Sequence, residues 1–406
     1  MENDDKSYLT AEASLVSNSA KGSEVGADFS PALDAAIDQA LADNLVVGAV
    51  VMVARKGALI YRRAAGLLDR EASTPMREDA IFRLASVTKL YVTVAAMQMV
   101  EEGKLALDDP VTKYLTYFRP RTADGEESII RIRHLMSHTA GLTYGFLEPE
   151  GGAYRRAGVS DGIDATGITL AENVKRIASL PLSYEPGTSW GYSVASDVLG
   201  AVLEVVDGCT LPEVIRRRVT DPLTITDTTF SVVDTSRLAV PYANSPEAGQ
   251  PPECMGARHQ ITFNGLTLNF VPDSIFDART FPSGGGGMAG TAIDTLKLLE
   301  ALRQGGGPLL KPESVERFTT NVVGELEANL AEPGWGFGLG CGICRDPAAA
   351  NLPVSAGTWS WGGVYGHKWF VDPARELSVV SLTNTTLAGT LGPFPNAVRD
   401  AIYGRG

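Results

Sequence analysis

The stretch Phe82-Arg83-Leu84-Ala85-Ser86-Val87-Thr88-Lys89-Leu90 contains the only S-x-x-K of this 406-residue chain. It opens a long amphipathic run, residues 87–102, which predicts a helix that begins at the motif. Residues three apart on a helix share a face, so we expect the Lys89 ammonium beside the Ser86 hydroxyl. The start of a helix also offers a free backbone N–H and the positive end of the dipole. The pattern therefore predicts a nucleophile with its own base, although an isolated S-x-x-K is more often a helix cap followed by a surface lysine.

Two distant segments supply groups that such a nucleophile needs. Pro186-Gly187-Thr188-Ser189-Trp190-Gly191-Tyr192 precedes an apolar helical pattern. This places the Tyr192 phenol where a loop enters a helix, suited to carrying protons. Trp361-Gly362-Gly363-Val364 precedes the strand-like alternation of residues 367–371. Its glycines allow the backbone to approach a ligand. We therefore expect N–H groups of this loop to complete an oxyanion hole with the backbone N–H of Ser86.

Further motifs lie in the same order and at family-like spacing, at residues 133–142, 221–223, 334–338 and 361–366. From about Ser30 to Tyr403 the chain resembles the serine β-lactamase and penicillin-binding-protein superfamily. The resemblance is greatest to the family VIII carboxylesterases, which are related to class C β-lactamases. It implies that Ser86 is the nucleophile, that Lys89 and Tyr192 are its partners, and that Val364 provides the second oxyanion N–H.

Two departures separate the chain from β-lactamases. Their third motif is Lys-Thr-Gly, whose lysine helps to hold the carboxylate of the β-lactam, whereas Trp361 occupies that position here. Their second motif is Tyr-x-Asn, whose amide binds the substrate, whereas this chain has Tyr192-Ser193-Val194. An apolar pocket discriminates weakly, and a site built to hydrogen-bond its substrate discriminates strongly. Both changes favour uncharged esters.

We therefore expect a serine carboxylesterase that hydrolyses short-chain uncharged esters through an acyl-enzyme, with water as second substrate and with no cofactor or metal. The expected substrate contacts are Tyr144, Phe146, Trp361, Gly362, Gly363, Tyr365 and His367. An acyltransferase or a weak β-lactamase would use the same acyl-enzyme. A non-catalytic ligand-binding relative is the alternative of another class.

The predicted fold is an α/β fold of the α+β type, like that of β-lactamases and transpeptidases. A helix from Ser30, a hairpin over residues 46–66 that turns at Lys56-Gly57, and strands near 359–361, 367–371 and 377–383 indicate one antiparallel sheet. Residues 30–85 and 276–406 would form this α/β domain, and residues 86–275 a mainly helical one. The active site would lie between them.

Composition excludes several classes of function. The net charge of −13 argues against a nucleic-acid or anionic-membrane partner, since both need a basic patch. The longest apolar run, residues 45–54, is too short to span a bilayer. Residues 1–29 are polar and predict a flexible tail without a secretion signal. With only four cysteines, the expected location is the cytoplasm.

Four other motifs are weaker. Ser160 lies in a G-x-S-x-G, but its flanks are polar and turn-like, whereas a nucleophile elbow needs a strand before it and a helix after it. Cys341 and Cys344 follow a strand-like segment, which disfavours a redox role. The glycines of 283–287 lack the Lys-Ser/Thr of a phosphate loop and favour close packing. His134 and His138 have no third metal ligand, so a structural role is expected for both.

Overall fold

The computed structural model describes residues 28–164, 167–232, 234–245, 249–277, 280–326, 328 and 333–405. All but the last two residues of the predicted tail, 1–29, therefore lie outside the described residues. Helix α2 (Ser30–Ala42) begins where the sequence predicts it, with Pro31 in its first turn.

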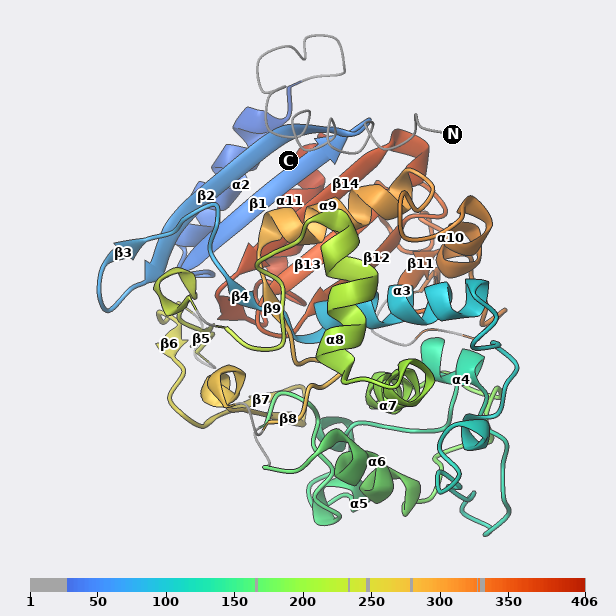
Figure 1. Cartoon of the computed structure of the whole chain (residues 1–406). Helices are drawn as coiled ribbons and strands as arrows, with labels where there is room; N and C mark the ends of the chain where they lie inside the picture. The colour runs from blue at the N-terminus through green and yellow to red at the C-terminus, as the bar shows by residue number, and fades with distance from the viewer. Residues whose placement is uncertain are drawn as a thin grey trace.

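An eight-stranded antiparallel sheet forms the centre of the molecule (Figure 1). Its order is β10 (Trp335–Phe337), β11 (Gly342–Cys344), β12 (Trp359–Gly363), β13 (His367–Asp372), β14 (Leu377–Thr383), β1 (Gly48–Arg55), β2 (Ala58–Asp69) and β3 (Thr74–Pro75). Strand β1 pairs with β14 in the middle, with Val51 opposite Ser381. The two ends of the chain thus build one sheet, which confirms the predicted fold class.

Helices cover both faces of this sheet, and this explains why β1 is buried along nearly its whole length. Successive side chains of a strand point to opposite faces. Val51 and Val53 share one core with α2 and with α11 (Pro393–Ile402). Val50 and Met52 share the other with α9 (Ala292–Arg303) and α3 (Thr88–Glu101). A third helix, α10 (Pro312–Thr319), contributes Val315 and Phe318 to this core.

The remaining helices lie below the sheet in the view of Figure 1. They are α4 (Ile132–Met136), α5 (Ala153–Arg156), α6 (Leu170–Ala178), α7 (Ala195–Asp207) and α8 (Leu211–Ile215). Among the helices of the described segments, none combines the length and apolar content that a membrane crossing requires.

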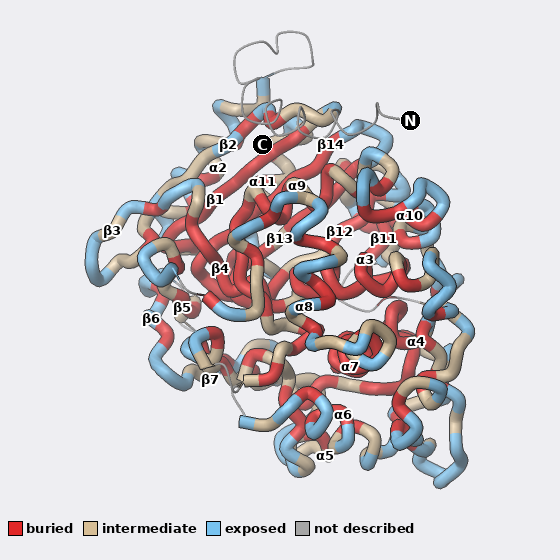
Figure 2. The backbone as a smooth tube through the Cα atoms, in the orientation of Figure 1, coloured by how far each residue is buried: buried red, intermediate tan, exposed pale blue. Residues whose placement is uncertain are grey.

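Two features differ from the expectation. Helix α3 is not amphipathic, because almost every residue from Thr88 to Met99 is buried, including Lys89 (Figure 2). It runs between the sheet and the other helices and so has no solvent face. The region 86–275 also contains short strands, β5 (Tyr242–Ala243), β6 (Glu253–Cys254), and the hairpin of β7 (His259–Phe263) and β8 (Leu266–Phe270). These strands have only two or five residues each, too few for an alternation of polar and apolar residues to predict them.

Candidate active site

Ser86 lies in a short 3-10 turn, Ala85–Val87, that leads directly into α3. Lys89 follows one turn later, and its Nζ donates a hydrogen bond to Ser86 Oγ over 3.1 Å. The Tyr192 hydroxyl, from the loop before α7, donates to the same oxygen over 2.6 Å. Lys89 is 1% exposed, whereas Ser86 and Tyr192 are half-buried. The structure thus brings the three predicted side chains together at one reachable hydroxyl.

The backbone before Ser86 is held in an unusual conformation. Ala85 has φ +44°, a left-handed value that costs free energy for a residue with a Cβ. Neighbouring contacts fix it. The strand β4 (Phe82–Arg83) pairs with β9 (Ala289–Gly290), and Leu84 N donates to Met288 O over 2.8 Å. This anchoring sets the position from which Ser86 enters the helix.

Lys89 also makes a contact that the sequence did not predict. Its Nζ donates to the carbonyl oxygen of Gly285 over 2.7 Å. The Gly285 N–H lies 3.2 Å from Oδ1 of Asp197, a fully buried carboxyl that also accepts from the Ser283 hydroxyl over 2.7 Å. Burial raises the pKa of Asp197, and the nearby charge of Lys89 opposes this rise. Two sequence features could have pointed to this contact: a charged residue, Asp197, in the apolar helical pattern after Tyr192, and the glycine run at 283–287.

Aromatic rings surround Tyr192. Its ring centroid lies 5.3 Å from that of Trp361 and 5.0 Å from that of Tyr144. Tyr144 in turn stacks on Phe146 at 4.7 Å. The Phe337 ring meets Trp361 edge-on at 5.2 Å. The sequence places Phe337 in the motif at residues 334–338 but does not predict this contact. Three of the predicted substrate contacts therefore form one aromatic wall around Tyr192, whose hydroxyl donates to Ser86 Oγ.

The turn that carries Val364 packs against the residues before Ser86. A Cβ on Gly363 would lie 2.2 Å from Leu84 O, and one on Gly362 would lie 2.4 Å from His367 O. Only glycine fits at these two positions without moving the backbone. Gly366 N donates to Gly363 O over 2.9 Å and closes the turn. Val364 is thereby placed next to the segment that leads into the nucleophile.

Two other predicted substrate contacts point elsewhere. His367 is 1% exposed, and its Nε2 donates to Arg83 O over 2.8 Å. Burial lowers the pKa of His367 to about 4, so the ring is neutral near pH 7. The Tyr365 ring meets Phe270 edge-on at 5.0 Å. Both side chains are held in the interior, so the contacts observed for them are with the protein core and not with the aromatic wall.

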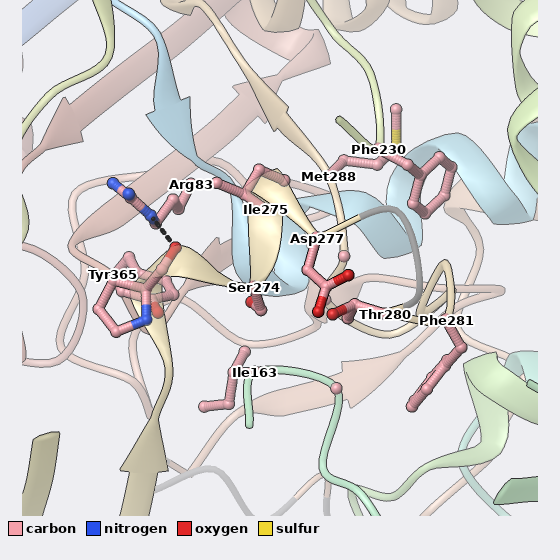
Figure 3. A pocket seen from close by; sticks show the side chains of 14 residues that line it. Arg83, Ile163, Phe230, Ser274, Ile275, Asp277, Thr280, Phe281, Met288 and Tyr365 are labelled. Atoms are coloured by element: carbon pink, nitrogen blue, oxygen red, sulfur yellow. Dashed lines mark hydrogen bonds between the residues drawn. The ribbon is translucent and has the colours of Figure 1, made fainter. Parts of the chain in front are cut away.

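Tyr365 lines a separate cavity (Figure 3). Arg83 borders this cavity, and its Nε donates to Pro272 O over 2.8 Å. A Cβ on Gly286 would meet Ile163 at 3.3 Å and Ala85 Cα at 3.8 Å. Gly286, which lines this cavity, therefore packs close to the residue before Ser86.

The weaker motifs occupy structural positions. Ser160 is fully buried, and its hydroxyl donates to Asp164 Oδ1 over 2.6 Å. It lies in a loop after the short helix α5 and not in a strand-to-helix turn. Cys341 and Cys344 are both buried, and burial raises the pKa of Cys341. His138 is buried with Nδ1 3.3 Å from the Ser193 hydroxyl.

Comparison with known proteins places this geometry in a family. The beta-lactamase family model matches residues 33–400. Esterase EstB of Burkholderia gladioli is 48% identical over 384 residues, which cover 93% of this chain and 96% of EstB.

Solved structures agree. EstCE1, described as a hydrolase with promiscuous acyltransferase activity, is 42% identical with a TM-score of 0.90, covering 93% of this chain and 98% of its own. A penicillin-binding protein homologue from Pyrococcus abyssi shares the fold at 20% identity, with a TM-score of 0.71 over 93% of this chain and 78% of its own. The chain therefore belongs to the beta-lactamase family and, within it, to the family VIII carboxylesterases.

Proposed function

We propose that this protein is a serine carboxylesterase that hydrolyses short-chain uncharged esters through an acyl-enzyme on Ser86. The observation that carries the proposal is the convergence of Lys89 Nζ and the Tyr192 hydroxyl on Ser86 Oγ, at 3.1 and 2.6 Å. A serine hydroxyl is a weak nucleophile until a neighbouring base takes its proton. The Lys89 amine and the Tyr192 phenolate could each accept this proton, so the step requires one member of the pair in its deprotonated form. The similarity to EstB supports the same activity.

In the proposed reaction, Ser86 Oγ attacks the ester carbonyl while its proton passes to the Tyr192–Lys89 pair. The negative oxygen of the tetrahedral intermediate is held by the backbone N–H groups of Ser86 and Val364. The pair then returns the proton to the leaving alcohol. Water attacks the acyl-enzyme along the same path and releases the acid.

The aromatic wall supports a preference for uncharged substrates. Trp361 lies against Tyr192 at 5.3 Å, where its indole can pack on the acyl group. The β-lactamase lysine that would bind a substrate carboxylate is replaced by this ring. We propose that Tyr144 and Phe146 complete the acyl pocket. The site would then lie between a sheet domain, residues 30–85 and 276–406, and a helical domain, residues 86–275.

Acyl transfer is the second candidate. It is favoured by the 42% identity to EstCE1, whose description includes promiscuous acyltransferase activity. An acyl-enzyme can be attacked by an alcohol as well as by water, so the acceptor that enters the pocket decides the product. We further propose a cytoplasmic location, because four cysteines in a chain of 406 residues are too few for a disulfide framework.

The direct test measures hydrolysis of p-nitrophenyl acetate and butyrate by the wild type and by Ser86→Ala. We expect turnover by the wild type and a loss of at least about 10³-fold in the variant. Adding methanol to the same assay and quantifying methyl butyrate separates transfer from hydrolysis. A wild type without esterase activity would identify a binding relative and refute the proposal.

A further inference from the structure

The buried carboxyl of Asp197 has no place in the reaction described above. It stands at the third residue of α7, five residues after Tyr192, and it is 0% exposed. Its Oδ1 accepts from Ser283 Oγ at 2.7 Å and from Gly285 N at 3.2 Å. Among the described residues, its Oδ2 is buried without a hydrogen-bond partner. A buried polar group in this state costs free energy, so its retention calls for a reason.

The contacts of Gly285 connect this carboxyl to the proposed proton path. Gly285 presents its N–H to Asp197 and its carbonyl oxygen to Lys89 Nζ, 2.7 Å away. A Cβ on Gly285 would lie 2.9 Å from the Tyr144 hydroxyl and 3.2 Å from Asp197 Oδ2. The side chains of Tyr144 and Asp197 therefore pack directly against Gly285 and leave little room for a side chain there. Any movement of the Asp197 carboxyl would shift Gly285 and with it the acceptor that orients Lys89.

We propose that Asp197 is a positioning residue, which holds Gly285 against Lys89 and supplies the negative charge that balances the proton carried by the Lys89–Tyr192 pair. This inference rests on the proposed function. The first turn of α7 then controls both partners of Ser86, because Tyr192 lies in the loop just before it and Asp197 acts on Lys89 through Gly285.

Among the described residues, the other titratable groups around Lys89 are Tyr192, Tyr144 and His138. The Tyr192 and Tyr144 rings lie 4.7 and 5.4 Å from Lys89 Nζ. The positive charge of Lys89 and, above all, burial lower the pKa of His138, so this ring is neutral at working pH. Asp161, whose pKa burial raises to about 7, acts on Tyr144. Asp197 is thus the carboxyl that interacts electrostatically with Lys89 itself.

The test compares Asp197→Asn with Asp294→Asn. Asp294 is a matched control, because it also occupies the third position of a helix, α9, and is 4% exposed, but its carboxylate accepts from Thr228 Oγ1 at 3.0 Å. Removing the negative charge disfavours the protonated form of the relay. We expect the acid limb of kcat/KM for p-nitrophenyl butyrate to move down by about one pH unit in Asp197→Asn, with a roughly tenfold lower kcat. Asp294→Asn should show the wild-type profile.

The inference is wrong if Asp197→Asn folds and its acid limb lies at the wild-type pH, or if Asp294→Asn shows the same shift. In either case an active wild type would still support the proposed function. A wild type inactive toward the ester would overturn both. Should Asp197→Asn not fold, Ser283→Ala decides, since it keeps the charge and removes one anchor of the carboxylate. It should lower kcat about threefold or more at unchanged KM, and a wild-type kcat would refute the positioning role.

Discussion

Replacing Tyr192 by phenylalanine removes one oxygen atom and leaves the ring in place. The contacts of the ring with Trp361 and Tyr144, at 5.3 and 5.0 Å, do not involve that oxygen. The lost interaction is the 2.6 Å hydrogen bond to Ser86 Oγ. A positioned proton-transfer group contributes about 10²- to 10⁴-fold to rate. We therefore expect kcat to fall by about 10³-fold, or about 4 kcal/mol of activation free energy.

The second half of the experiment combines this change with Lys89→Met, which keeps an unbranched chain in the buried position. Lys89→Met alone should also cost about 10³-fold. Two independent groups would give a double variant slower by about 10⁶-fold, whereas one shared relay leaves it little slower than either single variant. Initial rates with p-nitrophenyl butyrate measure this, and thermal unfolding checks that each variant is folded. Multiplicative losses would refute the shared relay.

Three further predictions concern selectivity and stability. The kcat/KM of the wild type should be much higher for neutral esters than for a chromogenic cephalosporin. Trp361→Lys should reduce this difference in kcat/KM, since a charge-assisted hydrogen bond to the cephalosporin carboxylate is worth about 1.5–3 kcal/mol. Equal wild-type kcat/KM for the ester and the cephalosporin would contradict this prediction. Ser160→Ala should keep kcat but lower the free energy of unfolding by about 1–3 kcal/mol, because half-buried Asp164 loses its 2.6 Å donor. Urea unfolding measures this. The pKa of His367 is about 6.5 in the unfolded chain and about 4 in the folded protein, so the free energy of unfolding should fall by up to about 3 kcal/mol as the pH drops from 6.5 to 4. In His367→Gln the free energy of unfolding should fall less over this range. An identical fall in the variant would show that His367 is not the cause.

The sequence predicts most of the sheet because its strands carry local signals. The β1–β2 hairpin turns at Lys56 and Gly57, whose φ values are 53° and 81°. Positive φ at both central residues is typical of a two-residue hairpin turn and favours glycine there. Val51 and Val53 alternate with Val50 and Met52, so each face of β1 meets a different helix layer. The sequence predicts an amphipathic α3, but its two threonines and its lysine are buried by contacts from distant parts of the chain, which the local pattern does not contain.

The candidate site was predictable where spacing along the chain fixes proximity, as for Ser86 and Lys89 within one helical turn. Asp197 and Gly285 were missed because 88 residues separate them, and their contact depends on how α7 packs on the glycine run. The directions of His367 and Tyr365 were also beyond the sequence. Tyr365 lies in the turn after β12, where its ring packs on Phe270, and His367 begins β13, where its ring is hydrogen-bonded to Arg83 O of β4.

The identity of the reactive serine is the central claim, and covalent labelling tests it most directly. Intact protein is treated with a p-nitrophenyl organophosphate, digested, and sequenced by mass spectrometry. A single adduct on the peptide that contains Ser86, absent from Ser86→Ala, is the result that the proposed relay predicts. Ser160 is the rival, since it lies in a G-x-S-x-G motif and its hydroxyl donates to Asp164 Oδ1. An adduct on Ser160, with Ser86→Ala still active on p-nitrophenyl butyrate, would contradict the proposed mechanism.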